Sequence, residues 1–208
     1  MNNYVITIAR SCGSGGSYVG ESLEKKLNIK LYGQDILQLA SEDSGISIDL
    51  FARSDEELNS NPLFRFTKYI YSGDLIPPSS SDFTSQENLF NYQAKVLKDL
   101  AEKESYIVIG RCADFVLKDN VNVIKVFICA DKHDRINTEA ERLSISKKEA
   151  ELRVEKVDKK RTAHYNYFTG NDRDDMTNYD ICLNTSVLSY DKCADIIVEY
   201  MKTRGIID

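Results

Sequence analysis

The stretch VITIARSCGSGGSYVGESLEKKL, from Val5 to Leu27, decides the fold class of this chain. Its first part is a β-branched run that predicts a buried strand, and its last part places Val19, Leu23 and Leu27 on one face of a helix. Three glycines stand between them, at positions 13, 15 and 16. A strand, a glycine-rich turn and a helix in this order are typical of a loop that binds phosphate through backbone N–H groups.

The loop departs at two positions from the common phosphate-loop pattern G-x-x-x-x-G-K-[ST]. Arg10 replaces the first glycine and Gly16 replaces the lysine, while Ser17 keeps the position whose hydroxyl ordinarily meets magnesium. Backbone N–H groups and the helix dipole can bind an anion without the lysine, and Arg10 can supply part of the lost charge. The expected phosphate-binding residues are Gly13, Ser14, Gly15, Gly16 and Ser17, with Mg²⁺ on Ser17.

Two alternatives remain open for the glycines at this point. A dinucleotide-binding turn G-x-G-x-x-G starting at Gly13 needs a third glycine where Tyr18 stands, although Asp35 lies far enough downstream to reach a ribose. The glycines are also compatible with a tight turn that binds nothing. Loop composition alone favours phosphate binding over both.

The rest of the chain alternates apolar runs with helical patterns. The expected strands are Tyr4–Ala9, Ile29–Tyr32, Tyr106–Gly110, Asn122–Cys129 and Tyr179–Leu183. Most of these runs lack polar alternation, which is typical of strands covered by helices on both faces. Helical patterns include one with a capping box at Ser146 and Glu149 and one from Asp191 to Lys202. This order predicts an α/β fold of three layers around a five-stranded parallel sheet.

Residues 48–93 do not fit this alternation and read as an inserted helical segment. Two of the three prolines and a serine run lie here, so we expect two helical pieces separated by a loop from Ser72 to Ser85. The segment is either decoration or an acceptor-binding cover, because long loops in compact domains often close over substrates. Residues 1–208 are otherwise expected to form one domain.

Composition limits the partners and the compartment. The net charge of −6 and the pI near 5.1 argue against nucleic-acid binding. Five dispersed cysteines without a CxxC pair predict reduced thiols and no zinc site. No secretory signal or membrane-spanning run is recognisable, so we expect a cytoplasmic protein. Cys12, in the loop at a helix start, is expected to have an acidified and oxidation-prone thiol.

Five stretches together resemble the cytidylate kinase-like family, relatives of the bacterial CMP kinases among nucleoside monophosphate kinases. In family order they are ITIARSCGSGGSYVGESLEKKL, YIVIGRCADFVL, VIKVFICADKHDRI, VDKKRTAHYNYFTG and NYDICLNTSVLSYDKCADIIVEY. The lysine-free Gly-Ser-Gly-Gly is itself usual in that family. The resemblance implies a P-loop NTPase fold that uses ATP and Mg²⁺ and acts on a small-molecule nucleotide.

The resemblance also implies roles for individual residues. Arg111 follows the strand YIVIG, at the carboxyl end where ligands of open α/β sheets bind, and CMP kinases use an arginine here on the acceptor phosphate. Cys112 replaces the aspartate of their Gly-Arg-Asp, with Asp114 as the nearest substitute. The implied catalytic residues are Arg10, Arg135 and Arg161, and the implied acceptor-binding residues are Asp35, Arg111, Asp114 and Asp158.

Residues 146–170 resemble the lid of those kinases. Asp158 and Arg161 match the second half of its Arg-x-x-x-Asp-x-x-Arg pattern, whereas Val154 takes the place of the first arginine. The function these features favour is transfer of the γ-phosphoryl group of ATP to a nucleoside monophosphate such as CMP or dCMP. The alternative is a nucleotide- or phosphate-binding module that has lost turnover and acts as a sensor.

Overall fold

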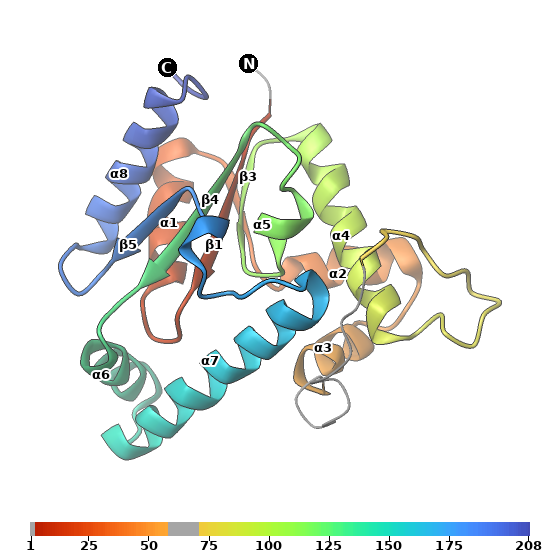
Figure 1. The fold of residues 1–208 in the computed structure, drawn as a ribbon, viewed down its shortest axis with the longest axis horizontal. Helices are drawn as coiled ribbons and strands as arrows, with labels where there is room; N and C mark the ends of the chain where they lie inside the picture. Colours follow the sequence, from red (N-terminus) through yellow and green to blue (C-terminus); the bar gives the residue numbers. More distant parts are fainter. Residues whose placement is uncertain (1–2, 58–70) are drawn as a thin grey trace.

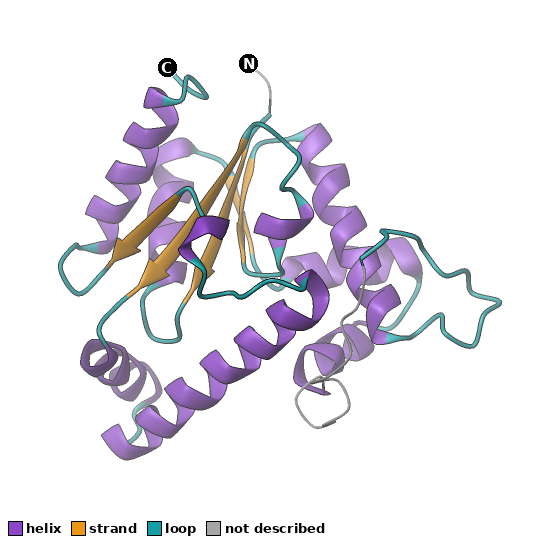
Figure 2. Cartoon of the chain, in the orientation of Figure 1, coloured by secondary structure: helices purple, strands orange, loops and turns teal. Residues whose placement is uncertain are grey.

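The computed structural model describes residues 3–57 and 71–208. In these ranges the elements follow the order β1, α1, β2, α2, α3, α4, β3, α5, β4, α6, α7, η2, β5 and α8. Figure 1 shows a central sheet with helices on both faces, and in Figure 2 the strand arrows point toward the side where α7 (Lys147–Thr169) lies. Within the described ranges no helix is both long and apolar enough to cross a membrane.

Five parallel strands form the sheet, in the order β2-β3-β1-β4-β5. Their bounds are Val5–Arg10 for β1, Lys30–Tyr32 for β2, Tyr106–Ile109 for β3, Val123–Cys129 for β4 and Ile181–Asn184 for β5. All five expected strands are confirmed, with small shifts at their ends. The order differs from the 3-2-1-4-5 order of the dinucleotide-binding fold, which argues against that alternative.

Both faces of the sheet are buried because alternate strand residues point to different helix layers. The covering helices are α1 (Gly16–Leu27) and α8 (Tyr190–Thr203) on one face, and α2 (Asp35–Ser44), α4 (Gln86–Lys103) and α5 (Ala113–Val116) on the other. Ile6 and Ile8 belong to the cluster under α1 and α8, whereas Val5 belongs to the other cluster. This two-sided burial explains why the strand sequences lack polar alternation.

Two helices that border the site begin in different ways. The N-cap of α1 is Gly15, which makes no side-chain capping bond. In α7 the expected capping box is present: the Glu149 N–H donates to Ser146 Oγ at 3.3 Å, and the Ser146 N–H donates to Glu149 Oε2 at 2.9 Å. Helix α7 therefore satisfies its own first turn, while α1 directs its N-terminal N–H groups at the glycine loop.

The middle segment is in part a core element. Helix α3 (Ile48–Glu57) is followed by residues 58–70, so the expected course of that stretch lies outside the described residues. Helix α4 begins where the expected Ser72–Ser85 loop ends and continues past position 93 into the core. Two buried amides of α4 hold the loop, since Asn88 Nδ2 donates to the Phe83 carbonyl at 2.7 Å and Asn91 Nδ2 to the Asp74 carbonyl at 2.6 Å.

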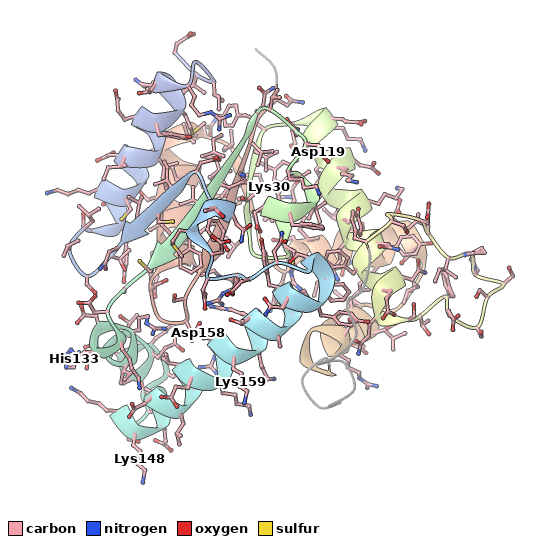
Figure 3. All side chains as sticks on the ribbon, in the orientation of Figure 1. Lys30, Asp119, His133, Lys148, Asp158 and Lys159 are labelled. Atoms are coloured by element: carbon pink, nitrogen blue, oxygen red, sulfur yellow. The ribbon has the colours of Figure 1, made fainter. Side chains whose placement is uncertain are left out.

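Helices α6 (Lys132–Leu143) and α7 lie across the carboxyl ends of the strands, opposite the end where both chain termini lie (Figure 1). Figure 3 places Asp158 on the side of α7 that faces the sheet, and Lys148 near the outer end of the helix. The long helix thereby covers the edge at which ligands of parallel sheets bind.

Candidate active site

Glycines shape the loop between β1 and α1. Gly13 and Gly15 have φ angles of +77° and +76°. A Cβ on Gly13 would lie 2.4 Å from the Arg135 carbonyl oxygen, and a Cβ on Gly15 would lie 2.2 Å from the ring of Tyr190. Both positions thus need glycine for backbone conformation and for space. The result is a loop packed closely between α6 and α8.

Hydrogen bonds fix this loop from behind. The hydroxyl of Ser14 lies 2.9 Å from the carbonyl oxygens of Ser11 and Ile128, and the Thr185 hydroxyl donates to the Ser14 carbonyl at 2.8 Å. The Ser14 side chain therefore stabilises the loop. No hydrogen bond within residues 3–57 and 71–208 uses the backbone N–H groups of Gly13, Gly15, Gly16 and Ser17. These N–H groups are the loop's donors for an anion.

Arg10, the last residue of β1, lies where a loop lysine would extend. A Cβ on Gly16 would lie 2.8 Å from Arg10 Cβ and 3.0 Å from Arg10 Cγ. A Cβ on Gly110 would lie 2.3 Å from Arg10 Nη1. The Arg10 side chain therefore passes over Gly16 and brings its guanidinium to Gly110 at the end of β3, and it needs glycine at both places.

The loop after β3 projects side chains instead of backbone groups. Arg111 and Cys112 have φ angles of +60° and +51°, which are uncommon for residues other than glycine. Cys112 Sγ lies 3.6 Å from His164 Nδ1 on α7. Asp114 is buried and accepts a hydrogen bond of 2.6 Å from the Tyr165 hydroxyl. Burial raises the pKa of Asp114 despite that bond.

The expected lid segment docks on the glycine loop through α7. Arg161 Nη1 donates to the Arg10 carbonyl at 3.2 Å, and Asp158 Oδ1 accepts from the Cys12 N–H at 2.8 Å. Arg135 of α6 donates to the other oxygen of Asp158 in a short ion pair. The carboxylate of Asp158 therefore acts as an internal anion on a backbone donor of the loop.

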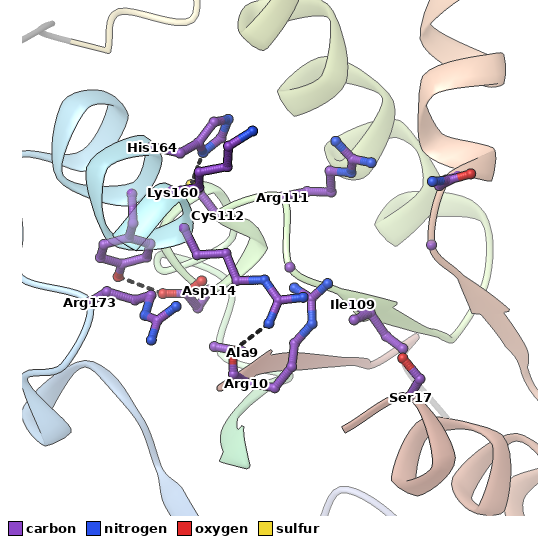
Figure 4. A pocket seen from close by; sticks show the side chains of 15 residues that line it. Ala9, Arg10, Ser17, Ile109, Arg111, Cys112, Asp114, Lys160, His164 and Arg173 are labelled. Carbon is purple, nitrogen blue, oxygen red and sulfur yellow. Dashed lines mark hydrogen bonds between the residues drawn. The ribbon is translucent and has the colours of Figure 1, made fainter. Parts of the chain in front are cut away.

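These elements enclose a cavity of about 370 Å³ (Figure 4). Five basic side chains line it: Arg10, Arg111, Lys160, Arg161 and Arg173. Asp114 is the only carboxyl group among the described lining residues, and it is engaged with Tyr165. Burial, and then the charges of Arg161, Arg111 and Arg173, lower the pKa of Arg10 to about 9. Such crowding of cations favours binding of a multiply charged anion.

Five of the twelve residues that the sequence marked line the cavity, and Gly13, Ser14, Gly15 and Gly16 of the glycine loop are not among its lining residues. Arg10, Ser17, Arg111, Asp114 and Arg161 all line the cavity. Arg135 and Asp158 are not among its lining residues; they pair with each other beside the loop. Asp35 is also outside the lining, although its carboxylate accepts from the N–H of Gly33, which does line the cavity.

Sequence reasoning missed Arg173 and Lys160 as members of the site. Arg173 stands in the run NDRDD, which reads as solvated charge, yet its exposed fraction is only 6%. The signal that could have found it is its position just after the expected lid segment, since α7 ends at Thr169 with Gly170 as its C-cap.

The expected reactivity of Cys12 is wrong. The residue is buried, and burial, followed by the nearby carboxylate of Glu139, raises the pKa of its thiol. These effects outweigh the nearby cations of Arg161 and Arg153, so the thiol is not acidified.

Comparisons with known proteins agree with this arrangement. The model of the cytidylate kinase-like family matches residues 5–187. An uncharacterized protein from Eubacterium ventriosum is similar at 27% identity and a TM-score of 0.70, over 97% of this chain and 100% of that one. No curated protein sequence matches the chain significantly.

Two named kinases share the fold at lower identity. A shikimate kinase from Bacteroides thetaiotaomicron is 11% identical, with a TM-score of 0.52 over 98% of this chain and 99% of that one. The Mycobacterium tuberculosis APS kinase CysC, in complex with AMPPNP and APS, is 17% identical, with a TM-score of 0.51 over 97% and 98%. These likenesses show that the chain has the three-layer fold of P-loop kinases around a parallel sheet.

Proposed function

Because the chain belongs to the cytidylate kinase-like family, we propose that it transfers the γ-phosphoryl group of ATP to a nucleoside monophosphate such as CMP or dCMP. One observation carries the proposal: Arg10 lies directly against Gly16, the position that the common phosphate-loop pattern gives to lysine. The missing lysine therefore does not deprive the loop of a cation. The charge comes from the end of β1 instead of the start of α1.

On the donor side, the N–H groups of Gly13, Gly15, Gly16 and Ser17 would hold the phosphates of ATP, supported by the N-terminal dipole of α1. Gly13 and Gly15 keep these groups turned inward, and Ser14 keeps the loop attached to β4 through the Ile128 carbonyl. Arg10 would neutralise negative charge that develops on the transferring group.

The residues present fit a magnesium ion that is held mainly by nucleotide phosphates. Within the described ranges no group of three or more His, Cys, Asp or Glu side chains could hold a metal. Mg²⁺ commonly keeps several waters and binds phosphate oxygens with few protein ligands, and the Ser17 hydroxyl lines the cavity as one such ligand. When bound, the ion would neutralise phosphate oxygens and hold them in register.

On the acceptor side, Arg111 and Arg161 would bind the acceptor's phosphate, because planar guanidinium groups pair with phosphate oxygens in two-point contacts. We place Asp114 and Asp35 near the acceptor's sugar or base. The segment 146–170 would act as a lid, and the segment 48–93 would complete the acceptor side within one domain of residues 1–208.

A second candidate is a nucleotide-binding module without turnover. It is favoured by the Asp158 carboxylate, which accepts from the Cys12 N–H at 2.8 Å and pairs with Arg135. A carboxylate in that place would compete with the outermost phosphate of a nucleotide. This candidate predicts that ATP raises the melting temperature while no ADP is formed.

The test is magnesium-dependent ADP formation from ATP with a panel of nucleoside monophosphates and a control without acceptor. We expect acceptor-dependent ADP formation that is fastest with CMP or dCMP. ADP formation with none of the acceptors, together with stabilisation by ATP, would support the binding module and contradict the kinase.

A further inference from the structure

Arg173 is a buried cation of the cavity to which the kinase resemblance assigns no role. It lies in the turn between α7 and the short helix η2 (Met176–Asn178), and its exposed fraction is 6%. The buried Tyr179 hydroxyl donates to the Arg173 carbonyl at 2.8 Å. The hydrogen bond therefore fixes the Arg173 backbone, and with it the point from which the side chain extends.

The guanidinium of Arg173 is hydrogen-bonded on one side and, in the part of the chain that the structure describes, lacks a hydrogen-bond partner on the other. Nε and Nη2 donate to Asp174 Oδ1 at 3.2 and 3.1 Å, and the group lies 5.8 Å from the ring centre of Phe127. Nη1 is buried and has no hydrogen-bond partner among the described residues. The nearest carboxylate is that of Asp158, at 3.8 Å, which is too long for a hydrogen bond.

A buried charged donor without an acceptor is costly unless a ligand supplies one. Asp158 already accepts hydrogen bonds from the Cys12 N–H and from Arg135, and it does not accept one from Nη1 of Arg173. Arg10, Arg111 and Arg173 line the same cavity from three different segments (Figure 4). Each guanidinium in that space increases the demand for negative charge.

We propose that Arg173 is a further residue that binds the phosphate of the acceptor. This inference rests on the proposed kinase function. Arg173 lines the cavity beside Asp114 and Tyr165, on the far side from the helix start that would hold ATP. A dianionic phosphate there would accept from Nη1 and share the charge of Arg161. A neutral sugar hydroxyl would leave the cations uncompensated.

The experiment is titration of inorganic phosphate, followed by calorimetry, into the protein saturated with a non-hydrolysable ATP analogue and Mg²⁺. Arg173→Gln should weaken phosphate binding by about tenfold to a hundredfold, the range for a charged hydrogen bond. Arg173→Lys should fall between it and the wild type, because lysine keeps the charge but loses the planar fork.

Arg204→Gln is the matched control. Arg204 donates to the Val123 carbonyl at 3.1 Å from the end of α8, near the chain termini and away from the cavity. This variant should bind phosphate as the wild type does. Melting temperatures of all variants identify any that fail to fold, in which case Arg173→Lys carries the test.

Kinetics with CMP separate a binding role from a structural one. Loss of Arg173 should raise KM for the acceptor more than KM for ATP, which a general loosening of the fold would not do. Unchanged phosphate affinity in a folded Arg173→Gln variant would overturn the inference. Absence of ADP formation with every acceptor, while phosphate affinity still depends on Arg173, would contradict the kinase function and leave the anion site standing.

Discussion

The loops that follow the neighbouring strands β1 and β3 present different chemical groups to the site. After β1, the left-handed positions belong to Gly13 and Gly15, and the loop offers backbone N–H groups. After β3, Arg111 and Cys112 themselves adopt positive φ, and the loop offers side chains to the cavity. Such a backbone costs about 1–2 kcal/mol for a residue with a Cβ. The comparison indicates a donor site made of backbone and an acceptor site made of side chains.

Arg10 connects these two loops. Its stem lies against Gly16 in the first loop, and its guanidinium lies against Gly110 in the second. One side chain thereby places a cation at the boundary between donor and acceptor, where a transferring phosphoryl group would be. Substitutions at Arg10 and Gly16 disrupt this connection, and substitutions at Gly15 and Asp114 affect one loop each.

Removing Arg10 should have the largest effect. Arg10→Ala is expected to lower kcat/KM by about a hundredfold to a thousandfold, the usual loss for one electrostatic contact to a transition state. Steady-state ADP formation measures it, with urea denaturation to show that the variant folds. Arg204→Ala, at the opposite end of the sheet, should keep wild-type kinetics. A similar loss in both variants would mean that Arg10 acts through folding alone.

Restoring the conventional lysine should reduce activity rather than raise it. In Gly16→Lys the new Cβ would lie 2.8 Å from Arg10 Cβ and 3.0 Å from Arg10 Cγ, so the backbone at one of the two positions must shift and the arginine side chain must move with it. We expect a loss of roughly tenfold to a hundredfold, from misplacing one cation. Gly16→Ala is the comparison, because it adds only the Cβ. A faster Gly16→Lys enzyme would contradict the spatial exclusion that the structure shows.

The cost of a positive φ angle and the cost of a steric clash at the glycine loop can be measured separately. Gly15→Ala must accept both φ +76° and the Tyr190 ring, whereas Gly45→Ala, at φ +73°, meets nothing within 4 Å. Gly45→Ala should lower the free energy of unfolding by about 1–2 kcal/mol, and Gly15→Ala by roughly 1–3 kcal/mol more. Urea denaturation compares them. Equal losses in the free energy of unfolding would show that the Tyr190 ring moves aside without an energetic cost.

The second loop should show a small pH effect through Asp114. Burial raises its pKa in the folded state, so its contribution to stability is present in acid and is lost as the pH rises above about 3.9, the ordinary aspartate value. Asp114→Asn still accepts from Tyr165 but cannot ionise. It should therefore gain stability relative to the wild type as the pH rises from 4 to 7, because the wild type must ionise a buried carboxyl group over that range and the variant need not.

Thermal unfolding at several pH values measures that gain. The exposed Asp119, replaced by Asn, is the control and should follow the wild type (Figure 3). A gain for Asp114→Asn that does not change with pH would place the effect in packing and not in ionisation.

The sequence predicted the strands and the loop because their signals are local. Glycines between a strand and a helix, and the pair Ser146 and Glu149, need no knowledge of distant contacts. Residues whose roles depend on packing were harder to place. Asp158 turns to the Cys12 N–H because α7 lies across the loop, and Arg173 is buried because Tyr179 and Phe127 cover its turn. Neither contact has a spacing that a sequence can reveal.

The most direct test of the central claim is the rate of magnesium-dependent ADP formation by the double variant Arg10→Gly with Gly16→Lys, compared with Arg10→Gly and Gly16→Lys alone. If the cation has moved from position 16 to position 10, glycine at position 10 removes the Cβ and Cγ that would lie 2.8 and 3.0 Å from the Cβ of residue 16, and so opens the space for the lysine. The double variant should then be faster than either single variant. A double variant as slow as the product of the two single losses would show that the two positions act independently and would contradict the account.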